Sequence, residues 1–201
     1  MFLESFLDEL TKIAASRKKS GESERDLYRR AQAIRRKAIP VIRREEKRLK
    51  ALGFKNTEHL GSMSFGLNLP DEGTSDIDIN VGVADPRKAS AELAAKGIPF
   101  TEIKQNSWIH RYVSPEGFEV EAKLRPAHEV DYMRRGAKSL QALSAKEKAK
   151  IVAEKHRLKK SGDKEAYKAY KWGIYEQHGI IPPGGAWSQI QPTKTKAKKR
   201  S

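Results

Sequence analysis

Two short polar motifs, separated by a loop, carry the residues of this chain that are best suited to chemistry. Gly61-Ser62 closes one predicted strand, and Asp76 and Asp78 begin the next. A glycine at such a turn lets phosphate oxygens approach backbone N–H groups, and the serine hydroxyl adds a donor. On a strand, Asp76 and Asp78 would project from one face, because side chains alternate, while Ile77 and Ile79 point into the core. Two adjacent carboxylates repel each other, and a bound divalent cation would relieve that repulsion.

A third acid comes from the segment Phe-Glu-Val-Glu-Ala-Lys-Leu-Arg at 118–125. Alternation places four polar residues on one face of this predicted strand: Glu119, Glu121, Lys123 and Arg125. A carboxylate there could complete a metal site or deprotonate an attacking hydroxyl. Glu121 is the first candidate, and Glu119 is the alternative because the spacing does not separate them. Lys123 and Arg125 could meet triphosphate oxygens on the same face.

The elements expected around these motifs are short strands and helices. We predict a helix over 24–52, capped by Ser23 or Ser20 and kinked or split at Pro40, and a second helix over 86–96. Strands are predicted at 57–61, 76–83, 98–104, 106–113 and 117–125. The chain after 127 is predicted to be helical, with Ser144 opening one helix and Asp163 another.

This order of elements predicts four regions. They are a basic helical region (1–53), an α/β core (54–126), a helical region (127–180) and a Pro/Gly-rich basic tail (181–201) whose composition predicts disorder unless a partner orders it. Residues 2–16 predict an amphipathic helix that docks on the domain or on a protein partner.

Composition narrows the classes of function. The formal net charge of +15 favours contact with polyanions, and a nucleic acid could lie along the arginines between Arg29 and Arg48 and along the C-terminal tail. The absence of cysteine excludes disulfides, thiolate catalysis and Cys-ligated metals. The five histidines lack ligand spacing. No apolar run is long enough to span a membrane and no secretory signal begins the chain, so the expected address is the cytoplasm, or a virion if the source is viral.

Over roughly residues 54–125, the chain resembles the DNA polymerase beta-like nucleotidyltransferase superfamily. The resemblance lies in Gly61-Ser62, a loop, and then Ser75-Asp76-Ile77-Asp78-Ile79. It implies an α+β fold with a short mixed sheet backed by helices. It also implies that Gly61 and Ser62 bind nucleotide phosphates, and that Asp76, Asp78 and a later acid bind Mg²⁺ or Mn²⁺.

Two further likenesses and two departures accompany this resemblance. Two features are similar to the GrpB branch: His59-Leu60-Gly61-Ser62 with the Asp-rich second strand, and the stretch 162–167 with Lys168 and Lys171. The Glu-x-Lys-x-Arg strand resembles the Glu-x-Gln-x-Arg strand of RelA/SpoT-type synthetases. The loop from Gly66 to Asp76 is longer than in the minimal members, and the third acid is a glutamate where an aspartate is commoner.

Two functions of different classes follow. The first is a metal-dependent nucleotidyltransferase that moves a nucleotidyl group from a nucleoside triphosphate to a hydroxyl acceptor, with Asp76, Asp78 and Glu121 as its metal-binding and catalytic acids. The second is a nucleic-acid-associated or assembly protein, cellular or viral, that keeps the fold as a scaffold. A metal-bound nucleotide between Ser62 and the acids would favour the enzyme. A side chain plugging the site would favour the scaffold.

Overall fold

The computed structural model describes residues 22–71, 76–104 and 107–190. The described elements up to the end of the sheet are α2 (Glu24–Ala51), β1 (Thr57–His59), α3 (Ser62–Phe65), β2 (Ile77–Val83), α4 (Pro86–Ala94), β3 (Thr101–Lys104), β4 (Ser107–Val113) and β5 (Glu119–Pro126). They are followed by α5 (Ala127–Ala142), α6 (Ala145–Lys160), α7 (Lys164–Gln177) and two 3-10 turns, Pro183–Gly185 and Trp187–Gln189. The predicted helix at 2–16 and the tail from 191 lie outside the described residues.

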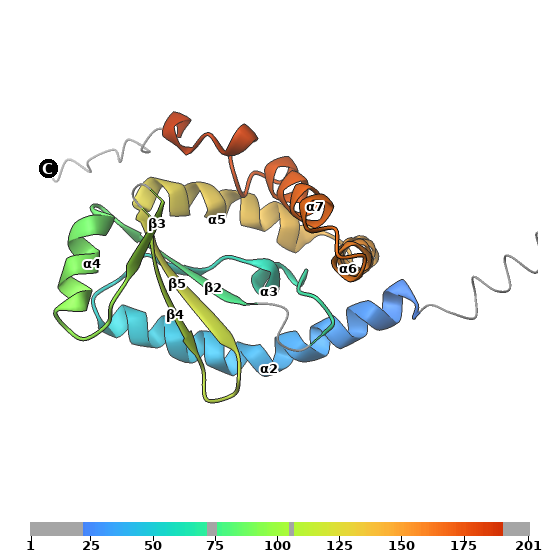
Figure 1. Ribbon diagram of the computed structural model, residues 1–201, viewed down its shortest axis with the longest axis horizontal. Coiled ribbons are helices and arrows are strands. Elements are labelled where there is room, and N and C mark those ends of the chain that lie inside the picture. The colour runs from blue at the N-terminus through green and yellow to red at the C-terminus, as the bar shows by residue number, and fades with distance from the viewer. Residues whose placement is uncertain (1–21, 72–75, 105–106, 191–201) are drawn as a thin grey trace, which may run out of the picture.

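The strands form one five-stranded mixed sheet in the order β1-β2-β5-β4-β3. The β2 and β5 strands run parallel, and each of the other neighbouring pairs is antiparallel. Figure 1 shows α2 along one face of this sheet and α5 along the other, with α6 and α7 near the end where β2 begins. The predicted α+β class with a short mixed sheet is therefore confirmed.

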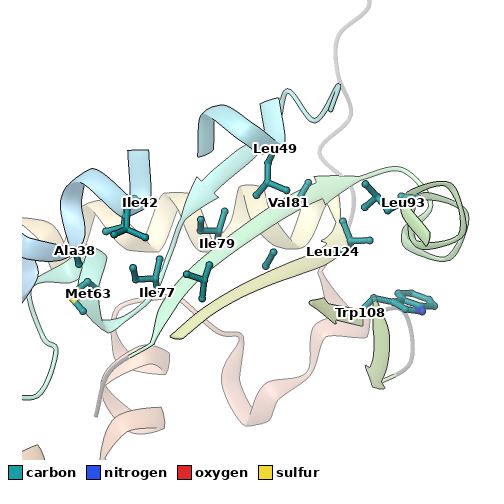
Figure 2. Packing of buried hydrophobic residues seen from close by; sticks show 14 of the residues in the cluster. Ala38, Ile42, Leu49, Met63, Ile77, Ile79, Val81, Leu93, Trp108 and Leu124 are labelled. Carbon is teal, nitrogen blue, oxygen red and sulfur yellow. The ribbon is translucent and has the colours of Figure 1, made fainter. Parts of the chain in front are cut away.

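Helix α2 covers one face of the sheet with a single apolar stripe. Its buried apolar residues recur at helical spacing: Leu27, Ala31, Ile34, Ala38, Val41, Ile42 and Leu49. Figure 2 shows Ile42 and Leu49 in one cluster with Ile77, Ile79 and Val81 of β2. This cluster leaves the opposite face of β2 free to carry polar side chains.

Pro40 does not split the helix, because α2 runs unbroken from Glu24 to Ala51. A proline inside a helix removes one backbone hydrogen bond and crowds the preceding turn. Ala38 and Val41, on either side of Pro40, are fully buried against the sheet. Tertiary packing therefore outweighs the local cost of the proline.

A second apolar cluster joins α5, α7 and the segment that follows α7 to the loop after β1. It contains Leu60, Phe65, Leu67, Val130, Met133, Ala137, Leu140, Tyr175, Ile180 and Ile181. The prediction of disorder from residue 181 is wrong for 181–190, because Ile181 is buried in this cluster and Trp187 contacts Tyr132 edge to face. The overall composition of the tail did not indicate that Ile181 and Trp187 pack against the domain.

Side-chain caps begin the three helices for which the sequence predicted them. Ser23 caps α2 and Asp163 caps α7, each by accepting a hydrogen bond from a backbone N–H of the first turn. Ser144 and Glu147 form a reciprocal capping box at α6. None of the described helices is both long and apolar enough to cross a membrane.

Candidate active site

The predicted acids lie where β2 and β5 begin, on the sheet face opposite α2. Asp78 lies directly across from Glu121 in the parallel register of β2 and β5, and Asp76 immediately precedes β2. Ile77 and Ile79 are fully buried on the other face, as alternation predicted. Glu121 is buried whereas Glu119 is exposed, so the structure distinguishes two glutamates that the spacing could not.

Gly61 lies against the carboxylate of Asp78. A Cβ atom at this position would overlap the carboxylate, so only glycine permits the approach. The backbone reinforces the contact, because the N–H of Leu60 donates to the carbonyl oxygen of Asp78 at 3.1 Å. The two motifs, separated by a loop in sequence, therefore share one wall of the site.

Lys123 neutralises part of the acidic cluster. Its ammonium group donates to the carboxylate of Asp78 and, at 2.6 Å, to that of Glu121. Arg111 of β4 also donates to Glu121 at 2.6 Å. Burial alone would raise the pKa of Glu121, but Lys123 and Arg111 outweigh burial and lower it. The side chain that we expected to meet phosphate is therefore paired with the acids.

Asp76 is the least compensated of the acids. Burial raises the pKa of its half-buried carboxyl, and the negative charges of Asp78, Glu121 and Glu119 raise it further. Within the described ranges, no side chain or backbone group forms a hydrogen bond or ion pair with its carboxylate. The start of β2 therefore keeps an excess of negative charge, which is what a cation would stabilise.

The residues fit a magnesium ion through Asp76 and Asp78. Among the described residues, no group of three or more His, Cys, Asp or Glu side chains is arranged as a metal cage. Mg²⁺ rarely needs one, since it is commonly held by one or two carboxylates together with substrate phosphates. Asp78, if Lys123 releases it, and Asp76, which has no ion pair among the described residues, would supply such a donor set.

Ser62 is held by two residues from the C-terminal helices that the sequence analysis missed. Its hydroxyl lies 3.0 Å from the Tyr175 hydroxyl and accepts a hydrogen bond from the Lys155 ammonium group at 3.2 Å. Lys155 also donates to the carbonyl oxygen of Leu67. Burial lowers the pKa of Lys155 to about 7, and the nearby charge of Lys171 lowers it as well. Burial raises the pKa of Tyr175.

One sequence feature could have identified Lys155. It lies three residues from both Val152 and Leu158, on the buried stripe of α6, where a lysine is unusual unless it has a function or a partner. Its link to Ser62 could not be found from the sequence, because the two are 93 residues apart.

Helix α7 covers the site with a row of residues spaced four apart: Tyr167, Lys171 and Tyr175. Burial raises the pKa of Tyr167, and the negative charge of Asp76 raises it further. Lys171 lies 5.8 Å from the centre of the Tyr175 ring. Tyr175, at the C-terminal end of this row, reaches Ser62.

Arg125, the other predicted phosphate contact, is also paired with protein groups. It donates to Asn80 at 3.0 Å and to Glu129 at 3.3 Å, and its guanidinium lies over the Trp187 ring at 5.7 Å. It links β5 to α5 and to the segment after α7.

The basic face of α2 is less free than the sequence suggested. Arg29, Arg30, Arg44 and Arg48 each form an ion pair, the shortest of them between Arg44 and Glu116 at 2.6 Å. Arg35 donates to the carbonyl oxygens of Met63 and Ser64 and so supports the loop that carries Ser62. Part of this arginine-rich face therefore has a structural role.

The chain was compared with known protein families, with curated proteins and with solved structures. No family model and no curated protein matches the chain. Among solved structures, it is similar to a cytoplasmic RNA terminal U-transferase, at 20% identity and a TM-score of 0.42, over 76% of this chain and 55% of that one. It is also similar to a chain from the complex between the Type VI effector Tas1 and its immunity protein, at 14% identity and a TM-score of 0.28, over 76% and 93%. This chain thus spans little more than half the length of the first neighbour.

Proposed function

We propose that this protein is a metal-dependent nucleotidyltransferase, which moves a nucleotidyl group from a nucleoside triphosphate to a hydroxyl acceptor. One observation carries the proposal: the Asp78 carboxylate lies against Gly61, beside the Ser62 hydroxyl that Lys155 and Tyr175 hold. An acidic pair suited to a cation and a group of donors suited to phosphate thus share one wall. Either group alone would be unremarkable, and together they match what a nucleotide–metal complex requires.

The residues divide into three roles. Asp76 and Asp78 would hold Mg²⁺ or Mn²⁺, which would offset the negative charge of the phosphates. The Ser62 hydroxyl and the Lys155 ammonium group would donate to phosphate oxygens. Glu121, the acid across from Asp78, would accept the proton of the attacking hydroxyl. The hydroxyl oxygen forms a bond to the α-phosphorus, the bond to the bridging oxygen breaks, and pyrophosphate leaves with its electron pair.

The proposal is tested by incubating the protein with each α-labelled nucleoside triphosphate and Mg²⁺ or Mn²⁺ and following label in products or in the protein. Asp78→Asn should abolish Mn²⁺-dependent nucleotide binding, because the amide lacks the charge that holds the cation. Asp85→Asn is the matched control, since Asp85 is exposed and caps α4, where asparagine serves equally well. Nucleotide binding that needs no metal, or that survives Asp78→Asn, contradicts the proposal.

One observation favours the second candidate function, a scaffold without catalysis. Lys123 lies between Asp78 and Glu121 and makes ion pairs that a purely structural network would also make. In that case the acids would bind no Mn²⁺ even when nucleotide is present. The measurement of Mn²⁺-dependent nucleotide binding therefore separates the two functions. Only the enzyme requires Lys123 to release the Asp78 carboxylate so that a cation can bind it.

A further inference from the structure

We propose that the turn between α6 and α7, together with the exposed row Lys164, Lys168 and Trp172 of α7, forms a binding site for a single-stranded polynucleotide, which serves as the acceptor. The assignment of the strand as acceptor rests on the proposed function, whereas the binding site itself does not. The site would take one unstacked base in a pocket and a second base on Trp172, with lysines along the phosphates.

The pocket lies at the turn and has a volume of about 290 Å³. Leu158 and the ring of Tyr167 supply apolar surface, while Lys159, Lys164 and Lys168 also line it. The remaining lining residues are Gly162 and Asp163, and Asp163 is engaged in capping α7. An apolar hollow bordered by cations suits a flat ring that carries a phosphate, since bases are bound by stacking and phosphates by charge.

The positive charge around this pocket is largely uncompensated. Residues 157–171 contain six lysines and arginines but only two acids, and one of the six, Arg157, pairs with Glu154 just outside this range. Lys159 and Lys164 have no ion pair among the described residues, and Lys159 lies over the Tyr167 ring at 5.6 Å. Lys168 pairs with Glu165, but both side chains are more than half exposed, so the pair contributes little.

An exposed row on α7 continues from the pocket. Lys164, Lys168 and Trp172 are spaced four apart and therefore lie one above the other on the helix surface. The Trp172 side chain is 48% exposed, which is unusual for the largest apolar side chain. Lys171 lies 5.9 Å from the centre of its ring. An aromatic platform beside lysines is the combination that holds single strands without reading their sequence.

This exposed row lies beside the row that covers the candidate active site. Tyr167 of the covering row also lines the pocket, and the negative charge of Asp76 contributes to the rise of its pKa. Trp172 contacts Tyr175 edge to face, with ring centroids 6.0 Å apart, and Tyr175 reaches Ser62. A strand on α7 would therefore have its end next to the acids. A duplex would not fit, because its bases are stacked on each other and cannot enter the pocket.

The test measures binding of a fluorescein-labelled 12-residue oligonucleotide to the full chain by anisotropy, in EDTA and without nucleotide. Single-stranded RNA, single-stranded DNA and a duplex are compared at several salt concentrations. Trp172→Ala should weaken single-strand binding about tenfold through the lost stacking. Lys164→Ala with Lys168→Ala should reduce the slope of log affinity against log salt by about 1.4, since each contact to a single strand contributes about 0.7.

Matched controls keep the overall charge and hydrophobicity equal. Lys88→Ala with Lys96→Ala removes two exposed charges from α4 and the turn that follows it, and Ile103→Ala removes another exposed apolar side chain. Both should leave affinity within about twofold. The proposal is overturned if no single strand binds, if the control pair reduces binding as much as the α7 pair, or if the duplex binds as tightly. The single strand that binds more tightly, RNA or DNA, is assigned as the acceptor.

Failure of this inference is distinguishable from failure of the proposed function. Because the binding assay contains neither metal nor nucleotide, it does not depend on Asp76, Asp78 or Lys155. Intact Mn²⁺-dependent nucleotide binding without oligonucleotide binding would overturn the acceptor site alone. Oligonucleotide binding that depends on α7, without nucleotide binding, would overturn the enzyme alone.

Discussion

The buried lysine beside Ser62 makes the stability of this protein depend on pH in a predictable direction. Lys155 is 2% exposed, and burial lowers its pKa from 10.5 in the unfolded chain to about 7 in the fold. Between these values the unfolded chain binds more protons than the native one, so the free energy of unfolding rises with pH. The full slope is about 1.4 kcal/mol per pH unit, and from pH 7 to pH 9 the gain amounts to about 2 kcal/mol.

Replacement of Lys155 by methionine removes this contribution while keeping a side chain of similar length. We expect urea denaturation at pH 7, 8 and 9 to show a rise for the wild type that is smaller by about 2 kcal/mol in Lys155→Met. Lys160→Met, an exposed position on the same helix, is the control and should keep the wild-type rise. Parallel pH profiles of wild type and Lys155→Met would refute the reasoning, because Lys155 would then be charged in the fold.

Three further substitutions test the geometry of the site. Asp78→Asn should lower turnover by about a hundred- to a thousandfold in the labelling assay. The urea midpoint should change little, because the lost attraction to Lys123 and the relieved repulsion from Asp76 oppose each other. A midpoint that falls steeply would show that Asp78 is mainly structural. Gly61→Ala should lower the free energy of unfolding by about 1–3 kcal/mol, because the added Cβ atom overlaps the Asp78 carboxylate. Gly173→Ala, where a Cβ atom would have no neighbour within 4 Å, should leave the free energy of unfolding unchanged or raise it. Equal effects of the two variants would exclude the close contact between Gly61 and Asp78. Tyr175→Phe should cost about 1 kcal/mol through the lost contact with Ser62, and Tyr170→Phe, which has no such contact, should cost less; the reverse order would count against that hydrogen bond.

Most elements of the fold could be read from the sequence because they depend on local patterns. The alternation of Asp76-Ile77-Asp78-Ile79 and the helical spacing of the α2 stripe each predicted the buried face correctly. Caps at Ser144 and Asp163 act within a single turn, so their positions were also accessible. The predicted split at Pro40 does not occur and the predicted disorder is wrong for 181–190, because packing against distant residues outweighs local preference there.

The candidate site could be predicted only in part. Periodicity placed Asp78, Glu121 and Lys123 on one face, but it gave no register between β2 and β5, so Glu119 and Glu121 were equivalent until the strands were paired. The pairing also decides that Lys123 contacts the acids. The roles assigned to these residues, like the four-region division of the chain, stay predictions for the experiments above.

The sequence by itself determined the acidic face, the Gly61-Ser62 turn and the excess of positive charge, because alternation, backbone freedom and charge are properties of short segments. Only the tertiary structure decided that Gly61 lies against Asp78, and that Lys155 and Tyr175 reach Ser62 from 93 and 113 residues away. It also decided which cations are neutralised, pairing four arginines of α2 and leaving Lys159 and Lys164 without an ion pair among the described residues. Contacts between distant segments follow from how the apolar faces pack, and a linear pattern does not contain that information.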